Sequence, residues 1–252
     1  YYKYFIDQGF KDHRVFANYG VILNNLGKLK EAENSYRKAI EMNPDFAEAH
    51  SNLGNILKEL GKLKEAEVST LKAIELNPNL SNAHYNLGNI LKELGKLKEA
   101  ETSYRKAIKI KPNYAKAYSN LGNILKDLGK LKEAELYTRK AIEINPNFAE
   151  AHSNLGNILQ ELGKSKEAAL STLKAIELNP NLSNSHYNLG KVLKDLGKLK
   201  EAEASYRKAI ELQPDSADAH NNLSFILLKE KKFKEGFNEY EWRLKVNDDK
   251  KN

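Results

Sequence analysis

Every proline in this chain recurs at one interval. The six prolines stand 34 residues apart, at positions 44, 78, 112, 146, 180 and 214. Twelve of the 14 glycines follow the same interval, in pairs seven residues apart that begin at Gly20, Gly54, Gly88, Gly122, Gly156 and Gly190. A period of this size is typical of a repeat architecture, in which each unit stacks on the next. We therefore divide the chain into regular repeats at 13–46, 47–80, 81–114, 115–148, 149–182 and 183–216.

One repeat has the pattern of two amphipathic helices. In 47–80, apolar residues recur at helical spacing on both sides of Gly61. A glycine lets the chain turn there, and Pro78 cannot continue the second helix. Small residues would let the paired helices approach closely: Gly54, Ala66 and Ala73. One hairpin cannot bury its apolar face alone, so the pattern predicts an all-α, right-handed superhelical α-solenoid of stacked hairpins.

The repeat resembles the tetratricopeptide repeat (TPR) family. The pattern that carries the resemblance in 47–80 is His50, Leu53, Gly54, Leu57, Ala66, Ala73 and Pro78. It recurs in phase through six repeats, and a longer period is visible as well, because 47–80 and 149–182 differ at only four positions. The resemblance implies helical hairpins whose first helices line a concave groove.

The two ends depart from the pattern. Tyr2, Phe5 and Ile6 fall on second-helix core positions, so we interpret 1–12 as the end of a preceding partial repeat. In 217–252 the glycine, alanine and proline positions are all replaced, which indicates a degenerate seventh repeat, a C-terminal cap or a junction. Its aromatic residues are predicted either to pack on the preceding repeat or to form a docking surface: Trp242, Tyr240 and Phe237. The segment also resembles the junction before a glycosyltransferase-like domain in some bacterial proteins.

Composition excludes several classes of function. The chain has no cysteine, so thiol catalysis, disulfides and cysteine-ligated metals are excluded. Five of the six histidines occupy one repeated helical position, too far apart to converge on one ion, and no catalytic set stands out. We expect no metal, no cofactor and no enzymatic activity in this fragment. No stretch has the apolar length of a membrane span, and we expect a cytoplasmic protein.

Asparagine is the most informative polar residue in the first helices. One column occupies the same position in all seven repeats: Asn18, Asn52, Asn86, Asn120, Asn154, Asn188 and Asn222. A second column lies one helical turn later: Asn55, Asn89, Asn123 and Asn157. A carboxamide both donates and accepts, which matches the N–H and C=O of an extended peptide backbone. The columns therefore predict a groove that binds extended peptide.

Two interpretations of the columns stay open at this stage. The asparagines could bind peptide, or they could bond to neighbouring repeats and hold the helices in register. The first column resembles the one in the superhelix of O-linked N-acetylglucosamine transferase, and that resemblance implies binding of extended polypeptide. The chain would then be a protein-interaction scaffold. Alternatives are the substrate-recruiting arm of a larger glycosyltransferase-like enzyme and a structural module that self-associates end to end.

The net charge of +7 is concentrated in the middle of the chain. Repeats 81–114 and 115–148 together have a net charge of +6. Three lysines of these repeats are predicted to lie near the groove, where they would favour an acidic ligand: Lys92, Lys116 and Lys126. Lysines between the helices, such as Lys62 and Lys96, are expected to be solvated on loops or rims, with their charges offset by nearby glutamates. Because no uncompensated basic face with stacking aromatics is evident, we expect neither nucleic acid nor membrane as a partner.

Overall fold

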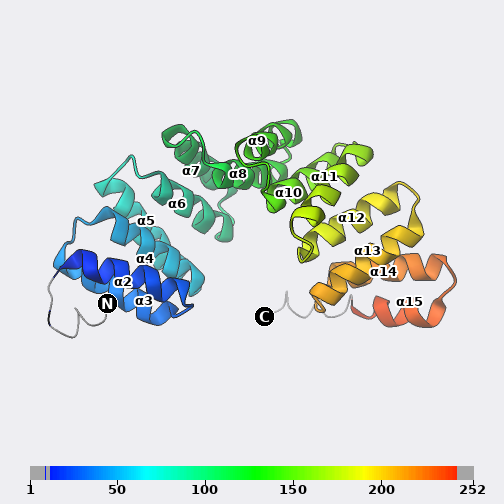
Figure 1. The fold of residues 1–252 in the computed structure, drawn as a ribbon, viewed down its shortest axis with the longest axis horizontal. Helices are drawn as coiled ribbons and strands as arrows, with labels where there is room; N and C mark the ends of the chain where they lie inside the picture. Colours follow the sequence, from blue (N-terminus) through cyan, green and yellow to red (C-terminus); the bar gives the residue numbers. More distant parts are fainter. Residues whose placement is uncertain (1–8, 10–11, 243–252) are drawn as a thin grey trace. The chain divides into compact units, whose positions relative to one another are not determined.

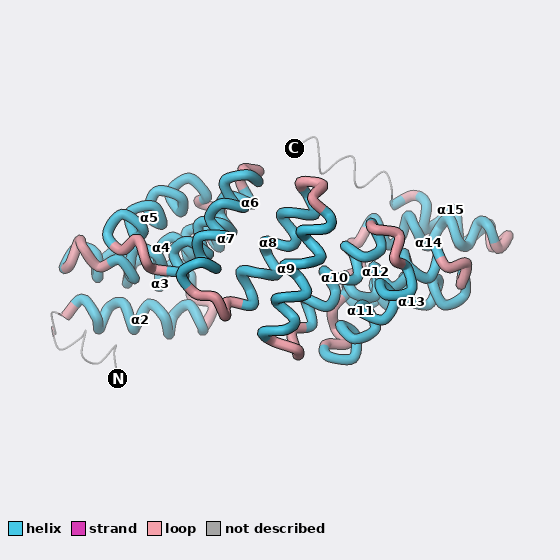
Figure 2. The backbone as a smooth tube through the Cα atoms, turned by 90° about the horizontal axis from the view of Figure 1, so that it is seen from above, coloured by secondary structure: helices cyan, strands magenta, loops and turns pink. Residues whose placement is uncertain are grey.

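Each 34-residue repeat folds into a pair of antiparallel helices joined by a tight turn (Figure 1). The computed structural model describes residue 9 and residues 12–242. These residues form fourteen α-helices and no strand, joined by short loops (Figure 2). The prediction of an all-α helical solenoid is thereby confirmed. Tyr2, Phe5 and Ile6, on which the expected partial repeat rests, lie outside the described residues, as does 243–252.

The helices fall into two compact units, which are described separately. The N-terminal unit, 1–128, contains α2 (His13–Asn25), α3 (Leu29–Met42), α4 (Ala47–Glu59), α5 (Leu63–Leu76), α6 (Ser81–Glu93), α7 (Leu97–Ile110) and α8 (Ala115–Asp127). The C-terminal unit, 129–252, contains α9 (Leu131–Ile144), α10 (Ala149–Glu161), α11 (Ser165–Leu178), α12 (Ser183–Asp195), α13 (Leu199–Leu212), α14 (Ala217–Lys229) and α15 (Phe233–Tyr240).

The turn inside each hairpin needs a left-handed residue. Gly61 has φ +76°, and Gly197 has φ +75°. At the same place in the last hairpin the chain has Lys231, whose φ is +61°. A side chain in this conformation is strained, because its Cβ approaches the following carbonyl oxygen. The degenerate repeat therefore keeps the turn but loses the residue suited to it.

The helices of a hairpin meet through residues with little or no side chain. A Cβ added to Gly88 would lie 2.6 Å from the ring of Tyr104, so the tyrosine occupies the space that the glycine leaves. In the preceding hairpin, Ala66 and Ala73 of the second helix α5 are fully buried. These contacts confirm that the repeated small residues permit close packing of each helix pair.

Ion pairs join the second helices of successive repeats. The Lys62 Nζ donates to the Glu33 carboxylate at 2.9 Å, and Arg37 binds both Glu33 at 2.8 Å and Glu65 at 3.1 Å. Lys96 pairs with Glu67 at 2.8 Å in the same way. The side chains of Lys62 and Lys96 remain 42% and 44% exposed, and each charge is offset by a glutamate of the preceding repeat. Stacking brings together side chains 29 residues apart, a proximity that local sequence does not reveal.

Candidate functional site

The first helices of each unit bring the predicted asparagines to one face. Asn52 lies on α4, Asn86 on α6 and Asn120 on α8, and α4 packs beside α6. In the C-terminal unit Asn154 lies on α10, Asn188 on α12 and Asn222 on α14. Asn18 is exposed on α2. The seven repeats thus place one amide per first helix, as the column predicts.

Most first-column asparagines reach back to the preceding repeat. The Asn86 Nδ2 donates to the Ser51 Oγ at 3.2 Å, and the Asn120 Nδ2 donates to the Tyr85 hydroxyl at 3.3 Å. The same link is made in the C-terminal unit by Asn188 to Ser153 and by Asn222 to Tyr187, each at 3.4 Å. These bonds cross between neighbouring first helices. They support the register interpretation for part of the column.

The second column has more varied surroundings. The Asn89 Oδ1 accepts from the Tyr104 hydroxyl at 2.7 Å and from the Asn120 Nδ2 at 2.9 Å. The Asn55 Nδ2 donates to Glu59 at 2.9 Å. The Asn157 Oδ1 accepts from Lys191 at 3.4 Å.

Several amide groups keep unused hydrogen-bonding capacity. Within residues 12–242, Asn52 and Asn123 have no hydrogen-bond partner for either side-chain atom. Asn86, Asn120 and Asn188 use only Nδ2 in that part of the chain, which leaves each Oδ1 available to a donor. None of these oxygens is among the fully buried unpaired atoms. The face therefore offers both acceptors and donors to a ligand.

A hollow of about 270 Å³ opens on this face of the N-terminal unit. It is lined by Asn24, Tyr36, Asn52, Asn55, Ile56, Asn82, Tyr85, Asn86, Tyr114 and Lys116. Five of these ten residues carry a side-chain carboxamide, and Lys116 is the single charged one. The lining is thus polar, with aromatic rings at its edge.

Two tyrosines form an edge of this hollow that sequence reasoning missed. The rings of Tyr85 and Tyr114 lie 4.9 Å apart, and the Tyr114 hydroxyl donates to the Asn82 Oδ1 at 3.1 Å. Burial, with a smaller contribution from Tyr85, raises the pKa of Tyr114 to about 12, so its hydroxyl is a proton donor at neutral pH. A signal was present: Tyr114 stands where the other repeats have Phe, Leu or Ser.

The C-terminal unit has a hollow of the same kind and of about 270 Å³. It is lined by Glu150, Ser153, Asn154, Asn157, Leu182, Asn184, Ser185, Tyr187 and Asn188. The buried Ser185 Oγ has no hydrogen-bond partner among the described residues. Here the single charged lining residue is an acid.

The three predicted groove lysines differ in their surroundings. Lys116 is exposed and lines the N-terminal hollow. Lys92 is exposed in the last turn of α6 and forms no ion pair within the described residues. Lys126 pairs with Asp127 at 2.9 Å, so its charge is offset locally. Of the three, Lys116 is the one in contact with the amide-lined hollow.

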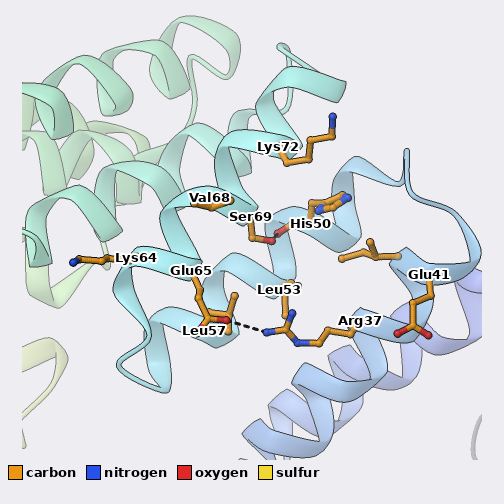
Figure 3. Close-up of a pocket in the computed structure, with 11 residues that line it drawn as sticks. Arg37, Glu41, His50, Leu53, Leu57, Lys64, Glu65, Val68, Ser69 and Lys72 are labelled. Carbon is orange, nitrogen blue, oxygen red and sulfur yellow. Dashed lines mark hydrogen bonds and ion pairs between the residues drawn. The ribbon is translucent and has the colours of Figure 1, made fainter.

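A larger hollow of about 660 Å³, called the outer hollow below, is lined by residues of α3, α4 and α5 in the N-terminal unit (Figure 3). Leu53 and Leu57 of α4 form part of its lining, and the ion pair of Arg37 with Glu65 spans one side. Val68, which lines it as well, is 69% exposed. This outer hollow is mainly apolar and lacks the repeated amides.

The aromatic residues of the last repeat pack within their own hairpin. Trp242 stacks flat on His220 of α14, with ring centroids 4.0 Å apart, and Tyr240 packs edge-on against Phe225 at 6.2 Å. Both of these ring contacts therefore lie within the last hairpin. Phe237 is 57% exposed. Its role as a docking residue stays a prediction.

The repeated histidines bind backbone carbonyls. The His50 Nε2 lies 2.9 Å from the Pro44 carbonyl oxygen, and His84, His152, His186 and His220 make the same contact with the proline six residues earlier. The constant spacing of proline and histidine was a visible signal for this link between repeats. Among the described residues, no group of three His, Cys, Asp or Glu side chains could hold a metal ion, and no helix is long and apolar enough to cross a membrane.

Three family profiles match the sequence, each at two or three places along the chain. A profile described as a TPR repeat matches 20–61, 88–129 and 190–230, and one described as a tetratricopeptide repeat matches 47–80 and 115–148. A second tetratricopeptide repeat profile matches 70–102, 137–169 and 172–204. No curated protein matches the sequence.

Solved structures of repeat proteins resemble the fold. YrrB, described as a TPR protein with an unusual peptide-binding site, is 30% identical, with a TM-score of 0.57 over 73% of this chain and 95% of its own. PilF from Pseudomonas aeruginosa is 19% identical, with a TM-score of 0.73 over 83% of this chain and 95% of its own. A tetratricopeptide repeat protein from Parabacteroides merdae is 20% identical, with a TM-score of 0.72 over 91% of each chain. The last two similarities concern the fold alone.

Proposed function

Because the chain belongs to the tetratricopeptide repeat family, whose members are generally protein-interaction scaffolds, we propose that it binds extended polypeptide along the asparagine-lined face of its first helices. The observation that carries the proposal is the unused hydrogen-bonding capacity of this face. Asn52 and Asn123 have no partner within residues 12–242, and Asn86 offers a free Oδ1. The description of YrrB as a peptide-binding TPR protein supports the same function.

The spacing of the amides suits a peptide backbone. Neighbouring packed helices lie about 8–10 Å apart, and an extended chain rises about 3.3 Å per residue. Each repeat would therefore meet roughly every third ligand residue. Bonds from the amides to backbone N–H and C=O groups would hold the ligand without strict dependence on its side chains. Lys116 at the N-terminal hollow would favour an acidic segment.

The hydrogen bonds of each asparagine decide which substitutions test peptide binding without disturbing the fold. Asn52→Ala and Asn123→Ala remove amides that hold no other residue within the described chain. Asn120→Ala instead removes a bond to Asn89. The first two variants should weaken peptide binding without lowering the melting temperature. Unchanged affinity in the Asn52→Ala/Asn123→Ala double variant, measured by calorimetry, would contradict the proposal.

Two alternative roles for a chain with such a groove remain proposals. A substrate-recruiting arm of a glycosyltransferase-like enzyme would use the same amide-lined face, with the polypeptide as the substrate to be modified. A self-associating module would not need the free amides. Peptide binding that depends on Asn52 therefore favours the first two functions over the third.

A further inference from the structure

The two small hollows are copies of one pocket. The N-terminal pocket contains Asn52, Asn55, Asn82, Tyr85 and Asn86, and the residue 102 positions after each of these is of the same type and lines the C-terminal pocket. This separation equals three repeats. The chain therefore carries the same set of four amides and one phenol ring twice, once in each unit.

The copies differ in charge at one edge. The N-terminal pocket is bordered by Tyr114 and Lys116, and the corresponding positions in the C-terminal unit are Ser216 and Asp218. Asp218 adjoins Tyr187 of the C-terminal pocket, because the Asn222 Nδ2 donates both to the Asp218 carbonyl oxygen at 2.9 Å and to the Tyr187 hydroxyl at 3.4 Å. The charge of Asp218 adds to the raised pKa of Tyr187, although burial contributes more. A cation in one copy is thus replaced by an anion in the other.

A second difference concerns Lys191, which stands where the N-terminal unit has Asn89. Its ammonium group donates to the Asn157 Oδ1 at 3.4 Å and lies 5.8 Å from the centre of the Tyr187 ring. Lys191 therefore contacts two residues that line the C-terminal pocket, Asn157 and Tyr187. Glu150 adds a carboxylate to the same lining, whereas its N-terminal counterpart, Glu48, is exposed and is not among the residues that line the N-terminal pocket.

We infer that the chain has two separate sites for extended polypeptide, one in each unit, and that the N-terminal site takes an acidic segment while the C-terminal site takes a basic one. The inference rests on the proposed function and assigns a ligand class to each pocket. The shared amides would bind the backbone of either segment. Lys116 and Asp218 would select its charge, because complementary charges favour association and like charges oppose it.

The probes are two blocked peptides of about nine residues, long enough to span roughly three repeats, one alternating Ser with Glu and the other alternating Ser with Lys. We expect each peptide to bind with a stoichiometry of one. In NMR spectra the Glu peptide should shift amide signals around Lys116, and the Lys peptide should shift those around Asp218. Lys116→Ala, which removes the cation without adding an anion, should weaken the Glu peptide about fivefold and leave the Lys peptide unchanged.

The charge-swap variant Asp218→Lys gives the sharpest control. It should create a second site for the Glu peptide, so that the stoichiometry rises from one to two, while circular dichroism stays that of the parent. Lys191→Asn should strengthen binding of the Lys peptide, because it removes a like charge from the C-terminal pocket.

The possible failures are distinguishable. If both peptides bind both units equally, or if Asp218→Lys leaves the stoichiometry at one, the charge assignment is overturned and the proposed function stands. If Asn52→Ala leaves the affinity for the Glu peptide unchanged, or if neither peptide binds, the proposed function fails and the inference fails with it.

Discussion

The Asn120 Nδ2 donates a hydrogen bond of 2.9 Å to the Oδ1 of Asn89 on the preceding first helix. The two asparagine columns therefore meet, and the Asn89 oxygen also accepts from Tyr104 of the hairpin's second helix. One amide thus joins three helices, whereas Asn52, in the same column as Asn120, holds no described residue. The register interpretation therefore applies to Asn120 and not to Asn52.

This division predicts a difference in stability between two identical substitutions. Both Asn120→Ala and Asn52→Ala raise helix propensity equally, but only Asn120→Ala removes hydrogen bonds. We expect Asn120→Ala to be less stable than Asn52→Ala by about 1 kcal/mol in the free energy of unfolding. Urea denaturation measures this difference. Equal stabilities would mean that the Asn120 bonds do not contribute.

The C-terminal unit contains a buried phenol without a hydrogen-bond partner among the described residues, and one substitution should supply that partner. The buried Tyr206 hydroxyl has no partner among the described residues, because Lys191 stands where Asn89 accepts from Tyr104. Lys191→Asn should provide the missing acceptor and raise the free energy of unfolding by about 1 kcal/mol. The matched reverse change, Asn89→Lys, should lower it. A loss of stability in Lys191→Asn would show that the contacts of Lys191 with Asn157 and Tyr187 outweigh the phenol bond.

The turn of the last hairpin should be improved by glycine. Lys231 adopts φ +61°, where a side chain costs about 1–2 kcal/mol. We expect Lys231→Gly to raise the melting temperature, since glycine adopts this conformation without the steric cost. Gly197→Ala, at φ +75° in the preceding hairpin, is the matched control and should lower it. Thermal unfolding followed by circular dichroism measures both melting temperatures. An unchanged or lower melting temperature for Lys231→Gly would show that the backbone of Lys231 is not strained.

The inter-repeat ion pairs predict a dependence of stability on pH. Hydrogen bonds from Lys164 and then from Arg139 outweigh burial and lower the pKa of Glu135 below its usual 4.5. A carboxyl whose pKa is lower in the folded state stabilises the fold above its unfolded pKa. That contribution is lost as the pH falls through the folded value. Glu135→Gln should therefore flatten the fall in unfolding free energy below about pH 4.5.

The control for this experiment is Glu143→Gln. Among the described residues, Glu143 pairs only with Lys140 one turn away in the same helix, and its side chain is 68% exposed. The Glu143→Gln variant should keep the parent protein's slope of unfolding free energy against pH. An identical slope in all three proteins would show that the pair of Glu135 with Lys164 does not link the repeats.

The fold was predictable because its signals are local and repeated. Gly61 predicts a turn and has φ +76°, and the small residue at Gly88 predicts the close packing that Tyr104 fills. The 34-residue period also predicted that the asparagines share one face of the first helices. It could not predict which residues the asparagines bond to, because those contacts depend on how neighbouring hairpins stack. Asn86 meets Ser51 across 35 residues, and Lys62 meets Glu33 across 29.

The central claim is that free amides on the first helices hold a peptide backbone. It is tested most directly by titrating the chain with the Ser/Glu peptide and following the side-chain amide NMR signals of Asn52 and Asn123. We predict that both signals shift with the dissociation constant measured by calorimetry. Unmoved asparagine signals, with shifts confined to Leu53, Leu57 and Val68 at the outer hollow, would contradict the account.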